Sequence, residues 1–266
     1  MQRSVTTIRR SRLPALTLMG SPSDPTVLLV HGANASKTCW RATLDELQNI
    51  GVSGAAIDLR GHGNSEGVDR LQQYQLADYV RDVTDALDAL PTVRHLVGHS
   101  MGGLVCQLVA ASRKLNKLTL VASSPVEGMR AEASRMFLRH PATFTAAIWK
   151  RSFLRLYQNR AVARSLLFHP ATSDQTVSLF LQDSQEESWL AASQMKTILP
   201  SPKEIDCHVD VLAGERDFMV SRKASEATAR AYRTRLHVVQ RCGHMIPYEA
   251  DPAELARLLG ANPGEA

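Results

Sequence analysis

The chain has 266 residues, of which 44% are hydrophobic and 21% are charged, as is ordinary for a globular enzyme. It is long enough to bury a large core as one domain with an insertion, and it contains no apolar run long enough to span a bilayer. The net charge of +5 is a mild basic excess, which is compatible with nucleic acid, a membrane surface or an anionic substrate.

The amino-terminus and the cysteines both bear on the cellular compartment. Residues 1–12 include four arginines but no apolar block behind them, so they do not form a secretory signal. The cysteines show no C-x-x-C pairing and are expected to be reduced thiols, not a disulfide frame or a zinc site. We therefore expect a cytoplasmic protein. The cysteines are Cys39, Cys106, Cys207 and Cys242.

Strand and helix patterns alternate along most of the chain. Residues 4–10 and 13–19 are expected to form the first two strands. Further strands, with apolar runs typical of burial on both faces, are expected at 26–30, 55–59, 94–97, 118–122, 207–212 and 236–239. Helices are expected at 40–50, 76–90, 104–111, 221–232 and 252–259. This order predicts an α/β fold with a mostly parallel central sheet and helices on both faces.

The alternation stops between residues 125 and 202, where the sequence is helical in character and has no buried strand run. We interpret this segment as a helical lid inserted over the strand ends. Residues 1–124 and 203–266 would then form the core.

A serine stands between two glycines where a strand changes to a helix, in Gly98-His99-Ser100-Met101-Gly102. Such a turn is tight enough to strain the serine towards positive φ, and only very small residues fit two positions before and after it. The turn would place the Ser100 hydroxyl at a helix N-terminus, where developing negative charge is favoured. The alternative to a nucleophile turn is an ordinary N-cap serine in a glycine-rich loop.

Asp217 and His244 also follow predicted strands, so both are candidates to act together with Ser100. A serine hydroxyl needs a base within hydrogen-bond reach, and the imidazole needs a carboxylate to orient it. Glu215 and Asp210 are rival acids, but Asp210 lies within its strand and Glu215 precedes the tip. Each residue alone could instead be a cap or a loop anchor, a role we expect for His31, His62, His99, Asp58 and Arg60.

At these segments the chain resembles the α/β-hydrolase fold superfamily, in HGANAS, DLRGHGNS, GHSMGG, AGERD and CGHMIPYE. The resemblance implies Ser100 as nucleophile, His244 as base and Asp217 as the acid that orients it. It also implies an oxyanion hole made by the backbone N–H groups of Ala33 and Met101. Such donors stabilise a tetrahedral oxyanion.

The serine favours acyl transfer over epoxide opening or halide displacement, for which members of this fold use a carboxylate at the elbow. We expect a serine hydrolase that cleaves a carboxylic ester or thioester through an acyl-enzyme. Two alternatives stay open: a carbon–carbon bond hydrolase, and a ligand-binding receptor with a slow triad. No metal or other cofactor is expected. A nucleotide is not expected either, because the glycines have neither dinucleotide-binding nor P-loop spacing.

Residues 126–168 carry eight basic side chains against two acidic ones, interleaved with large apolar residues. In one interpretation, these residues form a lid with an apolar inner face, and the charges are only solvated. In the other, the basic side chains form a docking surface for an acyl group carried on coenzyme A or an acyl carrier protein. Nucleic acid is not expected as a partner. The candidate substrate contacts are Asn34, Trp149 and Phe153.

Overall fold

The computed structural model describes residues 4–10, 13–20 and 24–260. One eight-stranded sheet runs through it in the order β1-β2-β4-β3-β5-β6-β7-β8. Strands β3 to β8 pair in parallel, whereas β1 and β2 join the sheet in antiparallel orientation. The strands are β1 Ser4–Arg10, β2 Leu13–Gly20, β3 Val27–Val30, β4 Gly54–Asp58, β5 His95–His99, β6 Lys117–Val121, β7 His208–Gly214 and β8 Leu236–Val239.

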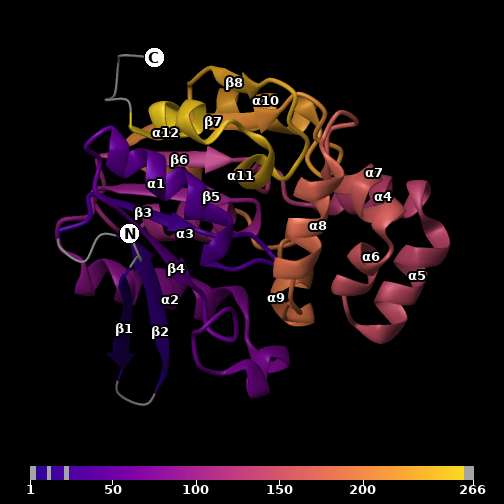
Figure 1. Ribbon diagram of the computed structural model, residues 1–266, viewed down its shortest axis with the longest axis horizontal. Helices are drawn as coiled ribbons and strands as arrows, with labels where there is room; N and C mark the ends of the chain where they lie inside the picture. Colours follow the sequence, from indigo (N-terminus) through magenta and orange to yellow (C-terminus); the bar gives the residue numbers. More distant parts are fainter. Residues whose placement is uncertain (1–3, 11–12, 21–23, 261–266) are drawn as a thin grey trace.

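Helices cover both faces of this sheet, as the apolar strand runs predict (Figure 1). In β3, Leu28 and Val30 belong to the cluster that includes residues of α2, α3 and α10, whereas Val27 and Leu29 face α1 and α12. These helices are α1 Arg41–Asn49, α2 Leu76–Ala89, α3 Met101–Ala110, α10 Arg222–Ala231 and α12 Pro252–Gly260. The α/β fold with a mostly parallel sheet is therefore confirmed.

Between β6 and β7 the chain forms further helices, which lie beyond one end of the sheet (Figure 1). We call residues 125–202 the helical segment. Its helices are α4 Arg130–Arg139, α5 Pro141–Lys150, α6 Leu154–Gln158, α7 Arg160–Leu167, α8 Asp174–Asp183 and α9 Trp189–Gln194. Short helices elsewhere are η1 Lys37–Trp40, η2 Val68–Gln73, η3 Pro202–Glu204 and α11 Ile246–Glu249.

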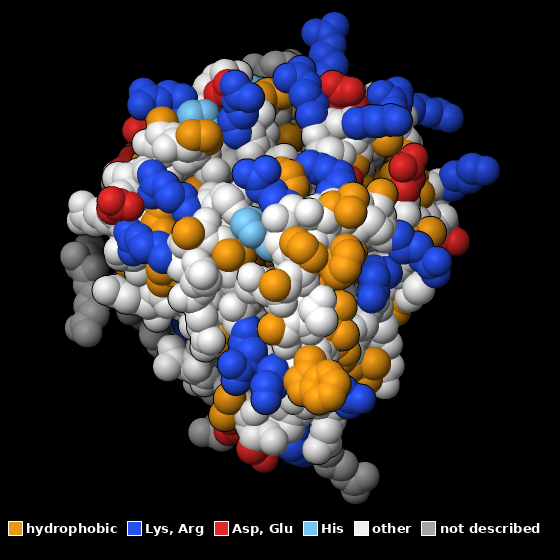
Figure 2. All heavy atoms as spheres, turned by 90° about the vertical axis from the view of Figure 1, so that its right-hand side faces the viewer, with side chains coloured by type: hydrophobic (Ala, Val, Ile, Leu, Met, Phe, Trp, Pro, Cys, Tyr) orange, Lys and Arg blue, Asp and Glu red, His pale blue; other side chains and the backbone are white. Residues whose placement is uncertain are grey.

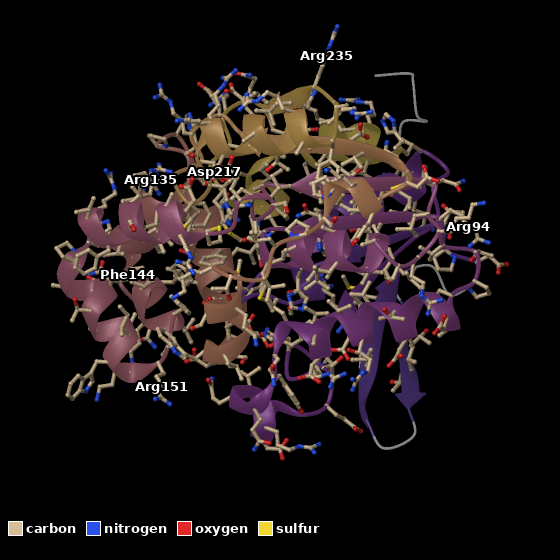
Figure 3. The ribbon with its side chains drawn as sticks, turned by 180° about the vertical axis from the view of Figure 1, so that it is seen from behind. Arg94, Arg135, Phe144, Arg151, Asp217 and Arg235 are labelled. Carbon is tan, nitrogen blue, oxygen red and sulfur yellow. The ribbon has the colours of Figure 1, made fainter. Side chains whose placement is uncertain are left out.

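The outer face of the helical segment carries many Lys and Arg side chains and few acidic ones, with hydrophobic side chains between them (Figure 2). Asp217 lies where the core meets this segment, whereas Arg94 lies at the opposite end of the molecule (Figure 3). Within the described residues, no helix is long and apolar enough to cross a membrane.

One helix begins earlier than its hydrophobic pattern suggests. The pattern predicts residues 104–111, but α3 starts at Met101, directly after Ser100. The serine alone makes the turn, so Gly102 and Gly103 already belong to the first turn of the helix. The serine is thereby placed at the helix N-terminus.

Candidate active site

The backbone turns sharply at Ser100, which has φ of 52° and ψ of −116°. A Cβ on Gly98 would lie 2.5 Å from the carbonyl oxygen of Gly102, and one on Gly102 would lie 2.3 Å from that of His31. Both contacts are too close for any side chain, so the turn requires glycine at these positions. The strained turn lifts the Ser100 side chain out of the sheet.

The structure brings Ser100, His244 and Asp217 together from the ends of three strands. His244 Nε2 lies 2.9 Å from Ser100 Oγ, and His244 Nδ1 lies 2.9 Å from Asp217 Oδ2. The side chains of His244 and Asp217 are only 4% and 2% exposed. The His244 backbone N–H also donates to the Leu167 carbonyl in the helical segment, at 2.7 Å. This arrangement can activate a serine hydroxyl as a nucleophile.

The two rival acids lie elsewhere. Glu215 accepts a hydrogen bond from the Arg241 backbone N–H at 2.9 Å. Asp210 is paired with Lys117 and His208, each at 2.9 Å. Burial raises the pKa of Asp210, but its bonds to Lys117 and His208 outweigh this effect and the net shift is downward.

Three other histidines hold loops around the site. His99 Nε2 donates to the His244 carbonyl at 2.9 Å, and His31 Nε2 accepts from the Leu59 backbone N–H at 3.1 Å. Burial lowers the pKa of His99 to about 3 and that of His31 to about 4. Both rings are therefore neutral near pH 7. His62 forms a buried ion pair with Glu187 of the helical segment, at 3.2 Å.

Asp58 and Arg60 anchor the neighbouring loop. Asp58 accepts hydrogen bonds from the backbone N–H groups of Lys37 and Asn64, at 2.7 and 2.8 Å. Arg60 Nε donates to Asp82 at 2.9 Å. Neither residue lines the cavity that contains Ser100 and His244.

The loop after β3 presents Ala33 towards the cavity beside Ser100. Within the described residues, the structure records no hydrogen-bond acceptor for the backbone N–H of Ala33 or of Met101. Asn34 has φ of 60° and is held at both backbone and side chain. Its Nδ2 donates to the Gln185 carbonyl at 2.9 Å, and its own carbonyl accepts from the Gln185 N–H at 3.1 Å. Gln185 therefore fixes this loop.

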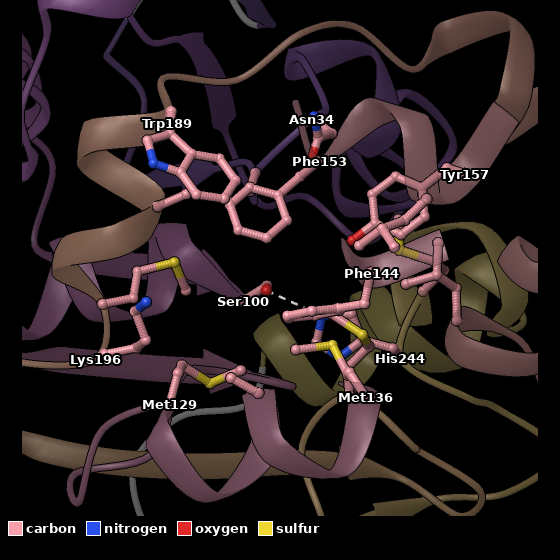
Figure 4. Close-up of a pocket in the computed structure, with 18 of the residues that line it drawn as sticks. Asn34, Ser100, Met129, Met136, Phe144, Phe153, Tyr157, Trp189, Lys196 and His244 are labelled. Atoms are coloured by element: carbon pink, nitrogen blue, oxygen red, sulfur yellow. Dashed lines mark hydrogen bonds between the residues drawn. The ribbon is translucent and has the colours of Figure 1, made fainter. Parts of the chain in front are cut away.

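A cavity of about 220 Å³ lies above Ser100 and His244, and most of its wall is apolar (Figure 4). Methionine and aromatic side chains of the helical segment form much of this wall. Phe153 stacks on Trp189 with ring centres 4.6 Å apart and an interplanar angle of 15°. The lining includes Met129, Met136, Phe144, Leu156, Tyr157, Phe180 and Met195.

Of the expected substrate contacts, Asn34 and Phe153 line this cavity but Trp149 does not. The Trp149 side chain is 81% exposed, because α5 buries Phe144 and Ala147 and turns Trp149 outward. Trp189 takes the place in the lining that we expected for Trp149. Helical spacing alone did not show which aromatic residues of a many-helix segment face inward.

The segment from Gln185 to Trp189 was missed by sequence reasoning. Ser188 caps α9 by accepting from the Ala191 N–H, and its Oγ donates to the Tyr74 carbonyl at 2.6 Å. The sequence signal was a serine followed by an apolar run, which predicts a helix start but not its partners on the core.

The described residues around this site do not form a metal-binding cluster. Within residues 4–10, 13–20 and 24–260, no group of three or more His, Cys, Asp or Glu side chains is arranged to hold a metal ion.

A comparison with family models matches residues 27–258 to the alpha/beta hydrolase family. The match spans most of the chain. The chain belongs to this family. The matched region contains the serine elbow, Asp217 and His244.

Curated relatives match shorter stretches. Epoxide hydrolase 3 of Xenopus tropicalis is 36% identical over 96 residues, which are 36% of this chain and 26% of that protein. Protein phosphatase methylesterase 1 of Mus musculus is 32% identical over 130 residues, which are 45% of this chain and 33% of that protein. The matched stretches thus span about a quarter to a third of these relatives.

Solved structures match over nearly the whole chain and share its fold. A bacterial membrane phospholipase A has a TM-score of 0.73 at 21% identity, covering 96% of this chain and 84% of its own. An esterase from Thermogutta terrifontis has a TM-score of 0.67 at 23% identity, covering 98% and 97%. A thioesterase domain from the curacin biosynthetic pathway has a TM-score of 0.68 at 18% identity, covering 98% and 100%.

Proposed function

We propose that the protein is a serine hydrolase that cleaves carboxylic esters or thioesters with an apolar acyl part through an acyl-enzyme. The observation that carries this proposal is the chain of 2.9 Å contacts from Ser100 through His244 to Asp217, at the floor of an apolar cavity. A serine at the elbow, in place of a carboxylate, favours acyl transfer over epoxide opening.

In the first half of the reaction, Ser100 Oγ attacks the acyl carbonyl carbon while His244 Nε2 takes the hydroxyl proton. The carbonyl oxygen becomes an oxyanion, which the N–H groups of Ala33 and Met101 are free to stabilise. The tetrahedral intermediate then collapses, the bond to the leaving oxygen or sulfur breaks, and the imidazolium protonates that atom. Asp217 stabilises the imidazolium without taking its proton.

In the second half, His244 accepts a proton from water, and the resulting hydroxide attacks the acyl carbon. The bond to Ser100 Oγ breaks, the proton returns to the serine, and a carboxylic acid leaves. His99 is neutral near pH 7 and already donates to the His244 carbonyl, so His244 is the base for both halves.

The acyl part would lie against the methionine and aromatic wall, where each buried methylene contributes about 0.8 kcal/mol. In this function the helical segment acts as a lid over residues 1–124 and 203–266. Asn34 and Phe153 are the proposed substrate contacts, and Trp189 joins them through its stack on Phe153.

The proposal is tested by covalent labelling with a fluorophosphonate, which reacts with an activated serine. One adduct is expected on the peptide that contains Ser100, together with many turnovers per site on p-nitrophenyl esters. Ser100→Ala should abolish both and leave far-UV circular dichroism unchanged. Ser112→Ala, beyond the other end of α3, is the matched control and should retain both activities.

An adduct on a different serine would overturn the assignment of the nucleophile. A single turnover per site, with no release of the acyl group, would instead indicate a receptor with a slow triad.

A further inference from the structure

Most basic side chains between residues 126 and 168 are already engaged. Arg135 is paired with Glu132, and Arg139 lies over the ring of Phe218, 4.8 Å from its centre. Two more arginines, Arg160 and Arg164, share Asp174 at 3.1 Å each. The basic excess of the sequence is therefore partly neutralised by contacts within the fold.

Three cations are different. The side chains of Lys150, Arg151 and Arg155 are exposed, and the described part of the chain provides no ion pair, hydrogen bond or ring contact for any of them. All three line one groove, which we call the basic groove; its other walls are Gln72, Ser152, Glu186, Trp189 and Leu190.

The basic groove is lined by one carboxylate, Glu186, which already has a hydrogen-bond partner. Glu186 Oε2 accepts a hydrogen bond from Ser152 Oγ at 2.8 Å. Three cations against one anion leave a net positive charge in a concave surface, which concentrates an anion there.

The basic groove adjoins the cavity above Ser100. Trp189 lines both hollows. Two consecutive residues also face different sides: Arg155 lines the groove, and the next residue, Leu156, lines the cavity. One wall of the helical segment thus presents cations on one side and an apolar surface on the other.

We propose that the basic groove binds the phosphates of an acyl-coenzyme A thioester while the acyl group occupies the apolar cavity. This inference rests on the proposed function. A substrate that uses both hollows needs an apolar acyl group, a reactive carbonyl, and a leaving group that carries phosphates on a long arm. Arg151 and Arg155 match phosphate oxygens as paired donors, and Lys150 adds a point charge.

The reaction then follows the acyl-enzyme route. Ser100 Oγ attacks the thioester carbonyl and the C–S bond breaks. The proton that His244 took from the serine passes to the departing sulfur, and free coenzyme A leaves past Trp189. Water then hydrolyses the ester on Ser100, so that a carboxylic acid and a thiol are the products.

The shape of the site favours a small polyanion over a flat lipid surface. The unpaired cations line a hollow that shares a wall residue with the catalytic cavity. A lipid surface would engage side chains that project outward, such as Trp149, which is not part of the groove.

The test compares two thioesters of the same acyl group, one on coenzyme A and one on N-acetylcysteamine, which has no phosphate. In Arg151→Glu/Arg155→Glu, kcat/KM for the coenzyme A thioester is expected to fall about tenfold to a hundredfold, since two charge-assisted contacts are lost. The value for the N-acetylcysteamine thioester should change by less than about twofold, because that substrate does not reach the groove.

Arg230→Glu/Arg235→Glu is the matched control, since it reverses the same number of charges. Both arginines are exposed, and Arg235 lies at the other end of the molecule from Arg151 (Figure 3). This variant should cleave both thioesters like the native protein. Added salt should lower kcat/KM only for the coenzyme A thioester. At physiological ionic strength, salt already screens interactions between charges more than about 8 Å apart.

Equal effects of the groove substitutions on both thioesters, or no effect on either, would overturn the inference. So would a charge effect seen only with an acyl carrier protein, or only in binding to anionic vesicles.

Two further measurements distinguish failure of the proposed function from failure of this inference. If Ser100 is not labelled by the fluorophosphonate, calorimetry of coenzyme A with Ser100→Ala still reports on the groove. Binding there that is lost with Arg151→Glu/Arg155→Glu supports the groove alone. If Ser100 is labelled and simple esters are cleaved but neither thioester is, only the thioester inference is overturned.

Discussion

At the scale of single residues, the choice between two acids that are two residues apart, Glu215 and Asp217, decides how His244 is held. Asp217 Oδ2 faces the imidazole, and its Oδ1 accepts from the Val220 N–H at 2.9 Å. Glu215 is turned towards the Arg241 backbone instead. A carboxylate fixed at both oxygens can hold the imidazole in one tautomer and one orientation.

Asp217→Asn should therefore lower kcat by a factor on the order of 10³ to 10⁴, because an amide can donate to His244 and favour the wrong tautomer. Glu215→Gln is the control and should stay within a few-fold of the native rate. Steady-state kinetics on a p-nitrophenyl ester measures both. A damaging Glu215→Gln beside a mild Asp217→Asn would assign the acid to Glu215.

At the scale of elements, the stretch between α8 and α9 fastens the helical segment to the core. Gln185 holds the Asn34 loop, and its Oε1 accepts from the Gly63 N–H at 2.7 Å. Two residues on, Glu187 pairs with His62 and accepts from the Tyr79 hydroxyl at 2.7 Å. The same short stretch thus contacts the loop that carries Ala33 and the loop after β4.

The His62–Glu187 pair makes stability depend on pH. Burial lowers the pKa of His62, but its contact with Glu187, together with the Arg60 carbonyl and the nearby Asp58, outweighs burial, and the net shift is upward from the ordinary 6.5. Burial raises the pKa of Glu187, but its contacts with His62, the Tyr79 hydroxyl and the Ser188 backbone together outweigh burial, and the net shift is downward from 4.5. The histidine contribution is complete below pH 6.5 and lost as pH rises through its folded pKa. The glutamate contribution is complete above pH 4.5 and lost as pH falls through its folded pKa.

His62→Gln should therefore lower the free energy of unfolding most between pH 4.5 and 6.5, by about 3 to 5 kcal/mol. The difference from the native protein should shrink above the folded pKa of His62. Urea unfolding at a series of pH values measures it. His31 lies beside His62, but burial holds its pKa near 4, so it stays neutral over most of this window. A difference independent of pH would show that the pair is not ionised.

At the scale of the whole molecule, the helical segment and the core share one hydrophobic cluster. Phe144, Leu156 and Phe180 of the segment belong to the same buried cluster as Leu28 and Leu120 of the sheet. Because the helical segment and the core bury each other's side chains in this cluster, unfolding of either part would expose apolar side chains of the other. The helical segment is therefore expected to unfold with the core.

Tryptophan fluorescence can follow the two parts separately, since Trp149 and Trp189 lie in the segment and Trp40 lies in the core. Thermal unfolding of the native protein should show one transition, with fluorescence and far-UV circular dichroism coinciding. Trp149→Phe/Trp189→Phe leaves Trp40 alone, and its fluorescence should again coincide with the circular dichroism of that variant. Separate midpoints would show that residues 125–202 fold as an independent unit.

The sequence alone determined the features that depend on local chemistry. The apolar runs gave the parallel strands, because strands buried on both faces need continuous hydrophobic residues. Gly98 and Gly102 marked the serine turn, because no larger residue fits there. Asp217 and His244 could be placed near Ser100 because parallel strands end at one edge of the sheet. The family assignment follows from the same segments and is confirmed.

Only the tertiary structure decided which side chains of the helical segment face inward. Periodicity gives a helix an apolar side, but several short helices can pack in many ways, and Trp149 and Trp189 are alike in sequence. The same holds for charge: the eight basic residues are equivalent along the chain, and only folding pairs Arg160 and Arg164 with Asp174 and leaves Arg151 unpaired in the described structure. Contacts between distant residues are set by packing, which no local pattern records.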